Sequence, residues 1–290
     1  MINFYGGNSY SWLASRTRLS DLRDYQEVTI TRPSDIVEDL VKQELHAATL
    51  HKKNIEDDGW RFDFSIYEPK KGIDVLADIV SNSNFFYRTN ITDGQPSIVG
   101  LKSQYSDSDV DKEINVNDLY SYNFSKTPVK DVAIKCRVKY GFDYVSEELV
   151  KVTDDITHDS SVLQDYKARY NAIDDEDFLL EHEAPYIQDE FVANKLRDYL
   201  FELNKNQHLK IKFSISLDRV IELEVGDVIG FVDYGGNRVN IGNVKPFGED
   251  MTSTYTLLDQ DTYPYFMITS IKKDLKKSDI ECVKLHKLGI

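Results

Sequence analysis

Oxygen-bearing side chains alternate along one acidic stretch of this sequence in the pattern of a calcium-binding loop. Calcium is a hard cation that takes six to eight oxygen ligands, so a calcium loop needs a suitable side chain at every second position. The stretch supplies them at positions one, three, five, seven, nine and twelve, which are Asp107, Asp109, Asp111, Glu113, Asn115 and Asp118. A metal site is therefore the first chemistry to consider.

Two positions of this stretch depart from a calcium loop. Lys112 stands where glycine makes the sharp turn, and Asp118 stands where a longer, bidentate glutamate is expected. Flanking helices are also missing, because Val99–Lys102 has the pattern of a strand. We therefore expect a solvated acidic hairpin loop at 107–118 and no cofactor, with a calcium site as the alternative.

Patterns for catalysis are weak elsewhere. Glu181, His182 and Glu183 form a tempting acid/base cluster, but neighbouring residues of an extended chain point to opposite faces. His46 and His51 are five positions apart, which is the wrong spacing for joint metal binding on one helix face. The nucleophile-elbow, zinc-protease and P-loop motifs do not occur in the sequence. We expect no catalytic residues, and hence no enzyme.

Aromatic residues gather near the C-terminal end and could form a stacking platform for sugars or bases. They are Tyr234, Tyr255, Tyr263, Tyr265 and Phe266. Aromatic side chains are also enriched at the centres of protein interfaces. We expect a barrel core and a subunit interface here, and expect His208 and His286 to be packing or surface residues.

The overall charge argues against tight nucleic-acid binding. The 290 residues include 50 acidic and 35 basic side chains, for a net charge of −15, whereas DNA binding needs clustered lysine and arginine. The short basic cluster Lys272–Lys277 is interrupted by Asp274.

No run of 18 apolar residues exists, so we expect no membrane span. Cys136 and Cys282 lie in alternating apolar stretches and are expected to be buried.

The clearest structural pattern runs through residues 184–231. Apolar residues recur at near-helical spacing over 185–207, and then at every second position over 208–217. A turn at Glu224–Asp227 leads into another strand at Val228–Phe231. Gly226 of that turn is the residue that adopts a positive φ without strain.

The rest of the chain predicts an α+β fold. Helices are expected at 33–47 and 73–80, strand Phe62–Ile66 between them, a hairpin at 85–101, and a strand of fifteen residues at 131–145. Residues 153–184 are acidic and hold at most a short helix near Val162–Tyr170. From 208 to 290, strands alternate with turns as in a small β-barrel, with further strands at Val239–Val244, Tyr255–Leu258, Tyr265–Lys272 and Glu281–Leu285.

Several of these segments resemble a known family, the tail-tip or baseplate hub proteins of tailed bacteriophages. The helix that ends near Lys205–His208, the alternating strand after it and the stretch Leu223–Phe231 carry the resemblance. Upstream, Arg32–Val37 is similar to the helix that opens the α/β part of such proteins, and Asn117–Ser125 leads into their long central strand. The resemblance covers roughly 30–290. Hub proteins also carry a barrel ahead of that helix, for which 1–30 is too short, so the sequence is a short variant or a fragment.

This resemblance implies a domain order and a role. The expected fold has a mixed α/β domain with two helices and a long antiparallel strand, followed by a C-terminal β-barrel. Its expected parts are an N-terminal arm (1–30), an α/β hub domain (31–152), an acidic linker or excursion (153–184), a helix packing on the α/β domain (185–207) and the barrel (208–290). The implied role is structural, in a homotrimeric ring of a virion tail that is assembled in the host cytoplasm and lets DNA pass. Its implied partners are the tail tube and tail-tip or fibre proteins. The alternatives are a cell-wall- or glycan-acting tail protein and a soluble ligand-binding module.

Overall fold

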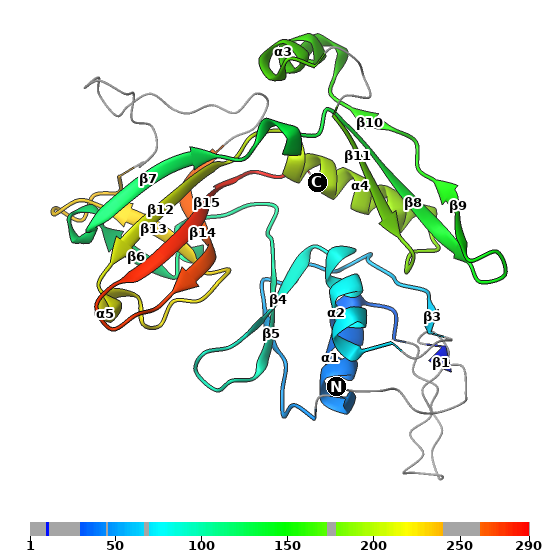
Figure 1. Ribbon diagram of the computed structural model, residues 1–290, viewed down its shortest axis with the longest axis horizontal. Helices are drawn as coiled ribbons and strands as arrows, with labels where there is room; N and C mark the ends of the chain where they lie inside the picture. Colours follow the sequence, from blue (N-terminus) through cyan, green and yellow to red (C-terminus); the bar gives the residue numbers. More distant parts are fainter. Residues whose placement is uncertain are drawn as a thin grey trace. The chain divides into compact units, whose positions relative to one another are not determined.

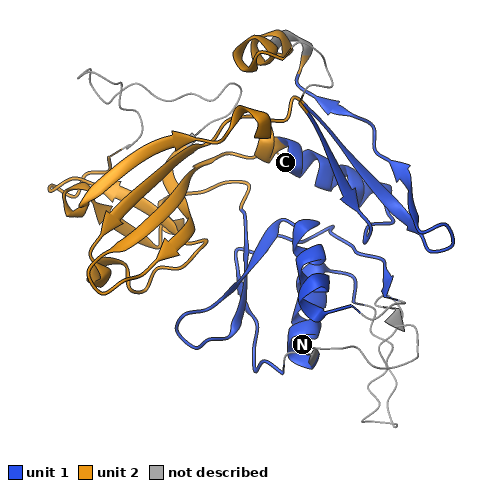
Figure 2. Cartoon of the chain, in the orientation of Figure 1, with its two compact units in different colours: residues 1–101, 135–158, 179–201 blue, residues 102–134, 159–178, 202–290 orange. Residues whose placement is uncertain are grey.

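The computed structural model describes residues 10–11, 30–44, 46–66, 70–172, 178–239 and 262–289. Figure 2 shows the chain as two compact units. Unit 1 comprises Met1–Leu101, Lys135–His158 and Leu179–Phe201, and unit 2 comprises Lys102–Ile134, Asp159–Phe178 and Glu202–Ile290. Helices and several sheets are mixed along the described chain (Figure 1), so the predicted α+β class is confirmed. The described helices include none long and apolar enough to cross a membrane.

Two helices and a small sheet form one part of unit 1 (Figure 1). Helix α1 covers Pro33–Glu44 and helix α2 covers Gly72–Ser81. The sheet has the strand order β2-β5-β4, from His51–Lys53, Pro96–Gly100 and Phe85–Thr89. Apolar residues of α1 recur at spacings of three and four and are fully buried, namely Ile36, Val37, Leu40 and Val41. Both helices and the β4–β5 hairpin are confirmed, although α1 ends three residues earlier than predicted. Of the predicted strand Phe62–Ile66, only Ser65–Ile66 (β3) is a strand; it pairs with β1, Tyr10–Ser11.

A second sheet of unit 1 is built around strand β8, Lys135–Asp143. Strands β9 (Glu148–Val152) and β10 (Ile156–Thr157) pair with β8 antiparallel, and β11 (Leu179–Ala184) pairs with it parallel. The strand is shorter than the predicted 131–145, because a 3-10 turn at Val129–Asp131 precedes it and a tight turn follows Asp143. Strand β11 was not predicted, and it places an acidic segment beside β8.

Helix α4 covers Glu190–Asn204 and confirms the predicted helix. Its apolar residues Val192, Ala193, Leu196, Tyr199 and Phe201 are buried, while charged residues alternate between them. Helix α3, Ser160–Tyr170, lies in unit 2 and confirms the predicted short helix. It ends at Asn171, whose φ of 56° is the left-handed conformation that asparagine tolerates.

Unit 2 contains a six-stranded sheet that curls into a half-barrel (Figure 1). The strand order is β6-β13-β14-β15-β12-β7, from Lys112–Asn115, Val228–Val232, Thr262–Lys272, Ser278–His286, Leu209–Ile215 and Ser121–Lys126. Strand β6 pairs parallel with β13, and the other neighbours pair antiparallel. Val239 is the one residue of the predicted strand 239–244 within the described chain, and strand 255–258 lies outside it, so barrel closure stays a prediction.

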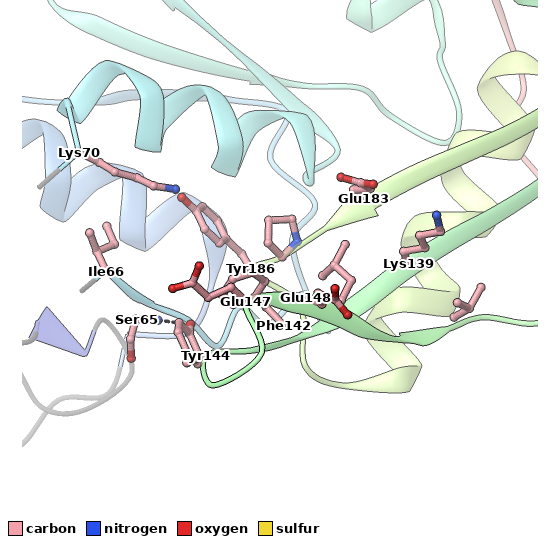
Figure 3. Close-up of a pocket in the computed structure, with 13 residues that line it drawn as sticks. Ser65, Ile66, Lys70, Lys139, Phe142, Tyr144, Glu147, Glu148, Glu183 and Tyr186 are labelled. Carbon is pink, nitrogen blue, oxygen red and sulfur yellow. Dashed lines mark hydrogen bonds between the residues drawn. The ribbon is translucent and has the colours of Figure 1, made fainter. Parts of the chain in front are cut away.

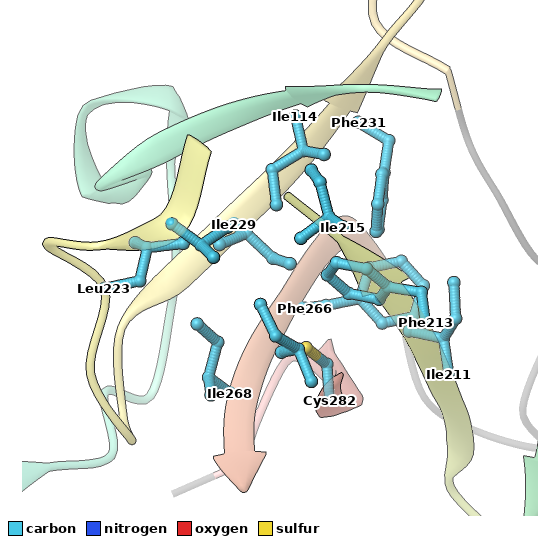
Figure 4. Packing of buried hydrophobic residues seen from close by; sticks show 12 residues of the cluster. Ile114, Ile211, Phe213, Ile215, Leu223, Ile229, Phe231, Phe266, Ile268 and Cys282 are labelled. Atoms are coloured by element: carbon cyan, nitrogen blue, oxygen red, sulfur yellow. The ribbon is translucent and has the colours of Figure 1, made fainter. Parts of the chain in front are cut away.

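The concave face of this sheet is filled by apolar side chains (Figure 4). Alternate residues of β12, Ile211, Phe213 and Ile215, point into the core, as the period of two predicted. Phe231 makes edge-to-face contacts with Phe213 and Phe266, with ring centroids 5.6 Å apart in both pairs. Each such side chain contributes about 1.5–3 kcal/mol by burial.

The turn before β13 has the expected backbone. Gly226 has a φ of 88°, which confirms the positive φ inferred from the sequence. Its amide donates to the Ile268 carbonyl at 2.7 Å, and the Asp227 carboxylate accepts from the Glu224 amide at 2.8 Å. The turn follows the short helix α5, Leu217–Val220. It leads into β13, which pairs antiparallel with β14 from Val228 onward.

Candidate functional site

The acidic stretch 107–118 is not the hairpin loop that the sequence predicted. It folds as two 3-10 turns, Asp107–Asp109 and Val116–Asp118, around strand β6. Ile114 of β6 is 3% exposed and packs in the core of unit 2. The prediction of a loop was wrong because one buried apolar residue and parallel pairing with β13 suffice to make this segment a strand.

Each side chain of the calcium pattern has a protein partner instead. Arg238 bonds both Asp107 and Glu113, to the latter at 2.7 Å, and the Tyr265 hydroxyl donates to Asp107. Asp109 lies 2.7 Å from the Lys102 ammonium, and this hydrogen bond lowers the pKa of the Asp109 carboxyl. A guanidinium and an ammonium thus occupy the place that a cation would take.

The remaining three positions serve the backbone or a different arginine. Asp111 accepts from the Val228 amide at 2.8 Å and Asn115 from the Asn117 amide at 3.0 Å. Asp118 lies 3.5 Å from the Arg219 guanidinium. Within the described ranges, no three His, Cys, Asp or Glu side chains are grouped so as to hold a metal ion. The arrangement ties β6 to its neighbours.

The segment Glu181–Glu183 lies in β11, and its side chains diverge. Glu181 bonds Arg137 at 2.7 Å and Lys139 at 2.5 Å across the pair with β8. His182 turns the other way and contacts the Asn82 side chain at 3.0 Å, and burial lowers its pKa. The sequence argument that these residues point to opposite faces therefore holds, and no acid/base pair forms among them.

Glu183 instead lines a cleft in unit 1 of about 630 Å³ (Figure 3). Strands β3, β8 and β9 and the residues after β11 wall the cleft. Its lining is mixed in character: Ser65, Ile66, Lys70, Lys139, Phe142, Tyr144, Glu147, Glu148, Leu149, Val152, Glu183, Pro185 and Tyr186. The sequence analysis did not find this cleft, because its residues come from four separate segments.

The turn between β8 and β9 places carboxylates at the rim of the cleft. Asp143 accepts hydrogen bonds from the Val145 amide at 3.0 Å and the Ser146 hydroxyl at 2.9 Å, which lower its pKa. Its carbonyl accepts from the Glu147 amide at 2.8 Å, and Glu147 has a φ of 57°. Glu147 and Glu148 are thereby held beside the opening, both exposed.

Tyr186 forms the opposite wall and is fixed by three contacts. Its ring stacks on Phe64 with centroids 4.0 Å apart, and its hydroxyl donates to Asp78 at 2.9 Å. Burial and the neighbouring Asp78 raise the pKa of Tyr186, so the phenol stays protonated. The Lys70 ammonium lies 3.7 Å from Asp78 and 5.9 Å from the Tyr186 ring centroid.

The lining of the cleft combines aromatic rings with carboxylates and two lysines. Its described lining includes no His or Cys, and Lys139 is held in an ion pair by Glu181. Aromatic walls with three glutamates favour a polar or cationic group.

The predicted aromatic platform is divided between core and surface in unit 2. Phe266 is fully buried, whereas Tyr234 is 82% exposed. Tyr263 and Tyr265 stack with centroids 6.0 Å apart, and Arg238 lies over the Tyr265 ring at 4.8 Å. Tyr255 lies outside the described residues. The rings therefore do not form one surface, and Tyr265 is occupied by the Arg238 cluster.

Known proteins were compared with this chain in three ways. No protein-family model and no curated protein matches the sequence. Among solved structures, a chain of the native gene transfer agent (GTA) particle virion matches with a TM-score of 0.49 and 12% identity, over 80% of this chain and 44% of that chain.

Two tail proteins resemble the chain to a similar degree. The 43 kDa tail protein of prophage MuSo2 from Shewanella oneidensis matches with a TM-score of 0.47 and 13% identity, over 87% of this chain and 65% of that chain. A tail protein from Neisseria meningitidis MC58 matches with a TM-score of 0.49 and 7% identity, over 87% and 66%. This chain thus spans less than two thirds of the length of each of the three, and all three TM-scores are below 0.5.

Proposed function

We propose that this protein is a structural component of a tailed-phage virion, without enzymatic activity. In its finer form the proposal is a tail-tip or baseplate hub subunit, assembled in the host cytoplasm. Such subunits would form a homotrimeric ring between the tail tube and tip or fibre proteins and let DNA pass. The sequence resemblance over residues 30–290 supports this role.

One structural observation carries the proposal: within the described residues, β7 and β6 are the outer strands of the unit 2 sheet, and aromatic side chains at β7 are exposed. Among the described residues, β7 pairs on one side with β12, and β6 pairs on one side with β13. Tyr120 and Tyr122, beside and within β7, are 62% and 59% exposed. Unprotected edges invite pairing with other chains, and a head-to-tail contact that uses two different edges can close a ring.

Unit 1 exposes a second apolar surface on the β8–β9 hairpin. Val145, Val150 and Val152 are 94%, 59% and 52% exposed. Exposed apolar groups clustered on one element indicate a contact surface. Two such surfaces on one chain are what a subunit with several different neighbours requires.

The solution mass of the purified chain tests the ring. We expect self-association that the Tyr120→Lys/Tyr122→Lys double variant abolishes, because edge lysines oppose strand pairing. Ile73→Lys, on the outer side of α2 where Ile73 is 60% exposed, is the matched control and should associate like the parent. A parent chain that stays monomeric at its highest soluble concentration, alone and mixed with tail tubes, would contradict the proposal.

The cleft of unit 1 supports a second candidate, a tail protein that acts on cell-wall glycans. Paired carboxylates and aromatic walls are the groups that sugar-cleaving sites use, and Glu147, Glu148 and Glu183 supply the carboxylates. Incubation with peptidoglycan separates the candidates. Release of soluble fragments that Glu183→Gln abolishes would favour the enzyme, whereas a structural subunit releases none. A monomer that binds a small ligand in this cleft without turnover would instead be a ligand-binding module.

A further inference from the structure

Two histidines that are distant in the sequence stack on each other inside unit 2. The imidazole rings of His208 and His286 have centroids 4.7 Å apart and planes inclined by 24°. His286 is 7% exposed, and its Nε2 has no hydrogen-bond partner in the described part of the chain. Buried polar atoms are normally paired. A proton bound at this nitrogen would place a positive charge without a hydrogen-bond partner in a buried position.

Both rings attach to the last turn of α4. Nε2 of His208 donates to the Leu203 carbonyl, and His286 makes a hydrogen bond with the backbone of Glu202. The final carbonyls of a helix lack partners within the helix, so the two rings satisfy groups that would otherwise be unpaired. A carbonyl only accepts, so Nε2 of His208 carries a proton, which a neutral ring can supply.

The backbone around the rings is fixed, so the stack cannot slide apart freely. Thr127 bonds His208 twice, through its Oγ1 and its amide, each at 2.9 Å. His286 is paired with Thr262 at the end of β15. The Gly289 amide donates to Glu202 Oε2 at 2.9 Å, which holds the chain after His286 against α4.

The charges around the stack are mostly positive. Lys205 follows α4, is buried, and lies 2.8 Å from the partly buried Glu202 carboxylate. Lys205 acts unfavourably on a positive His286, and Lys210 of β12 does so on a positive His208. Lys284 lies two residues before His286, on the same face of β15, and is 4% exposed. Glu202 is the one carboxylate in this set, and Lys205 and Gly289 already occupy it.

We propose that the His208–His286 stack is an acid-sensitive contact, which holds the last turn of α4 to β12 and β15 while both rings are neutral and opens when they gain protons. The chain passes from unit 1 to unit 2 between Phe201 and Glu202. The contact therefore holds the residues of unit 2 that directly follow this junction. The inference is independent of the proposed function.

The direction of the pH effect follows from the folded and unfolded states. Burial, and then the neighbouring His208, lowers the pKa of His286 to about 3, and burial lowers that of His208. An unfolded histidine has a pKa of about 6.5, so the unfolded chain binds more protons below that pH. The contact is fully stable above about pH 6.5. As pH falls from there towards 3, the folding equilibrium constant drops by up to about tenfold per pH unit through His286, and His208 acts in the same direction.

The experiment follows the imidazole proton signals by NMR in the intact chain while the pH is lowered from neutral. Of the six histidines, His208 and His286, assigned by single substitution, should both fail to titrate near pH 6.5. Titration of both near 6.5 in the folded chain would overturn the proposal.

Chemical unfolding of unit 2 at several pH values gives the second measurement. His286→Phe keeps a flat ring without a titratable group. Per pH unit, the folding equilibrium constant of this variant should change about tenfold less than that of the parent. His208→Gln keeps a donor for Leu203 and should act in the same direction. The control His46→Asn removes an exposed imidazole at φ 52°, which asparagine tolerates, and should change nothing. Equal pH dependence in His286→Phe and the parent would refute the proposal.

Discussion

Replacing Gly226 by valine should destabilise unit 2 by about 1–3 kcal/mol. The φ of 88° at Gly226 lies beyond even the small left-handed region that other residues visit, and a β-branched side chain is the least tolerant of it. The backbone cannot relax cheaply, because the Gly226 amide bonds Ile268 at 2.7 Å and the Ile268 amide bonds Asp227 at 2.9 Å. Each of these hydrogen bonds contributes about 0.5–1.5 kcal/mol.

Calorimetry measures this effect, because it separates two units that melt at different temperatures. For a unit of 150–250 residues, 1 kcal/mol corresponds to about 2–4 °C in Tm. Gly226→Asn is the matched control, since asparagine accepts positive φ more readily than valine, and its Tm should lie between those of the parent and the valine variant. A valine variant with the Tm of the parent would refute the argument from φ. An asparagine variant with a Tm below that of the valine variant would also refute it.

Three further predictions concern the core, the acidic stretch and the charge. Phe231→Ala removes a fully buried ring from the centre of the unit 2 core. It should lower the unfolding free energy, measured by denaturant titration, by about 3–5 kcal/mol. A loss below about 1 kcal/mol would contradict this packing. Millimolar calcium should leave Tm unchanged, because Arg238 and Lys102 occupy the carboxylates. A calcium site would instead raise the unfolding free energy by about 2.7 kcal/mol at a hundredfold excess of calcium over Kd, and Asp107→Ala would abolish that rise. The chain should bind no duplex DNA even at low salt, given its net charge of −15. Submicromolar binding with a steep salt dependence would contradict the proposal that the ring lets DNA pass without binding it.

Local patterns predicted the elements whose burial is periodic. Strand β12 has apolar residues at every second position, and helix α4 has them at near-helical spacing, so each element's inward face could be read before any partner was known. Gly226 was identifiable for the same reason, since a turn between two apolar strands needs a residue that tolerates positive φ. In these segments local preference and tertiary packing agree.

Contacts between distant residues were not predictable from the sequence. The cleft draws on four segments between Ser65 and Tyr186, and the His208–His286 stack joins residues 78 positions apart (286 − 208). No periodicity marks either set, because periodicity reports one element's inward face and not which elements meet there.

Two of the strands that the sequence analysis missed, β6 and β11, were missed for a shared physical reason. Both lie in acidic segments that read as solvated, yet each pairs parallel with a strand that contributes buried residues. In each case a basic partner from another segment neutralises the acid: Arg238 bonds Glu113, and Arg137 and Lys139 bond Glu181. Hydropathy counts such carboxylates as exposed charge, whereas cross-strand pairs reduce their cost at a sheet edge. The described carboxylates of these segments therefore do two things. Glu113 and Glu181 hold β6 and β11 in place, whereas Glu147, Glu148 and Glu183 line the cleft.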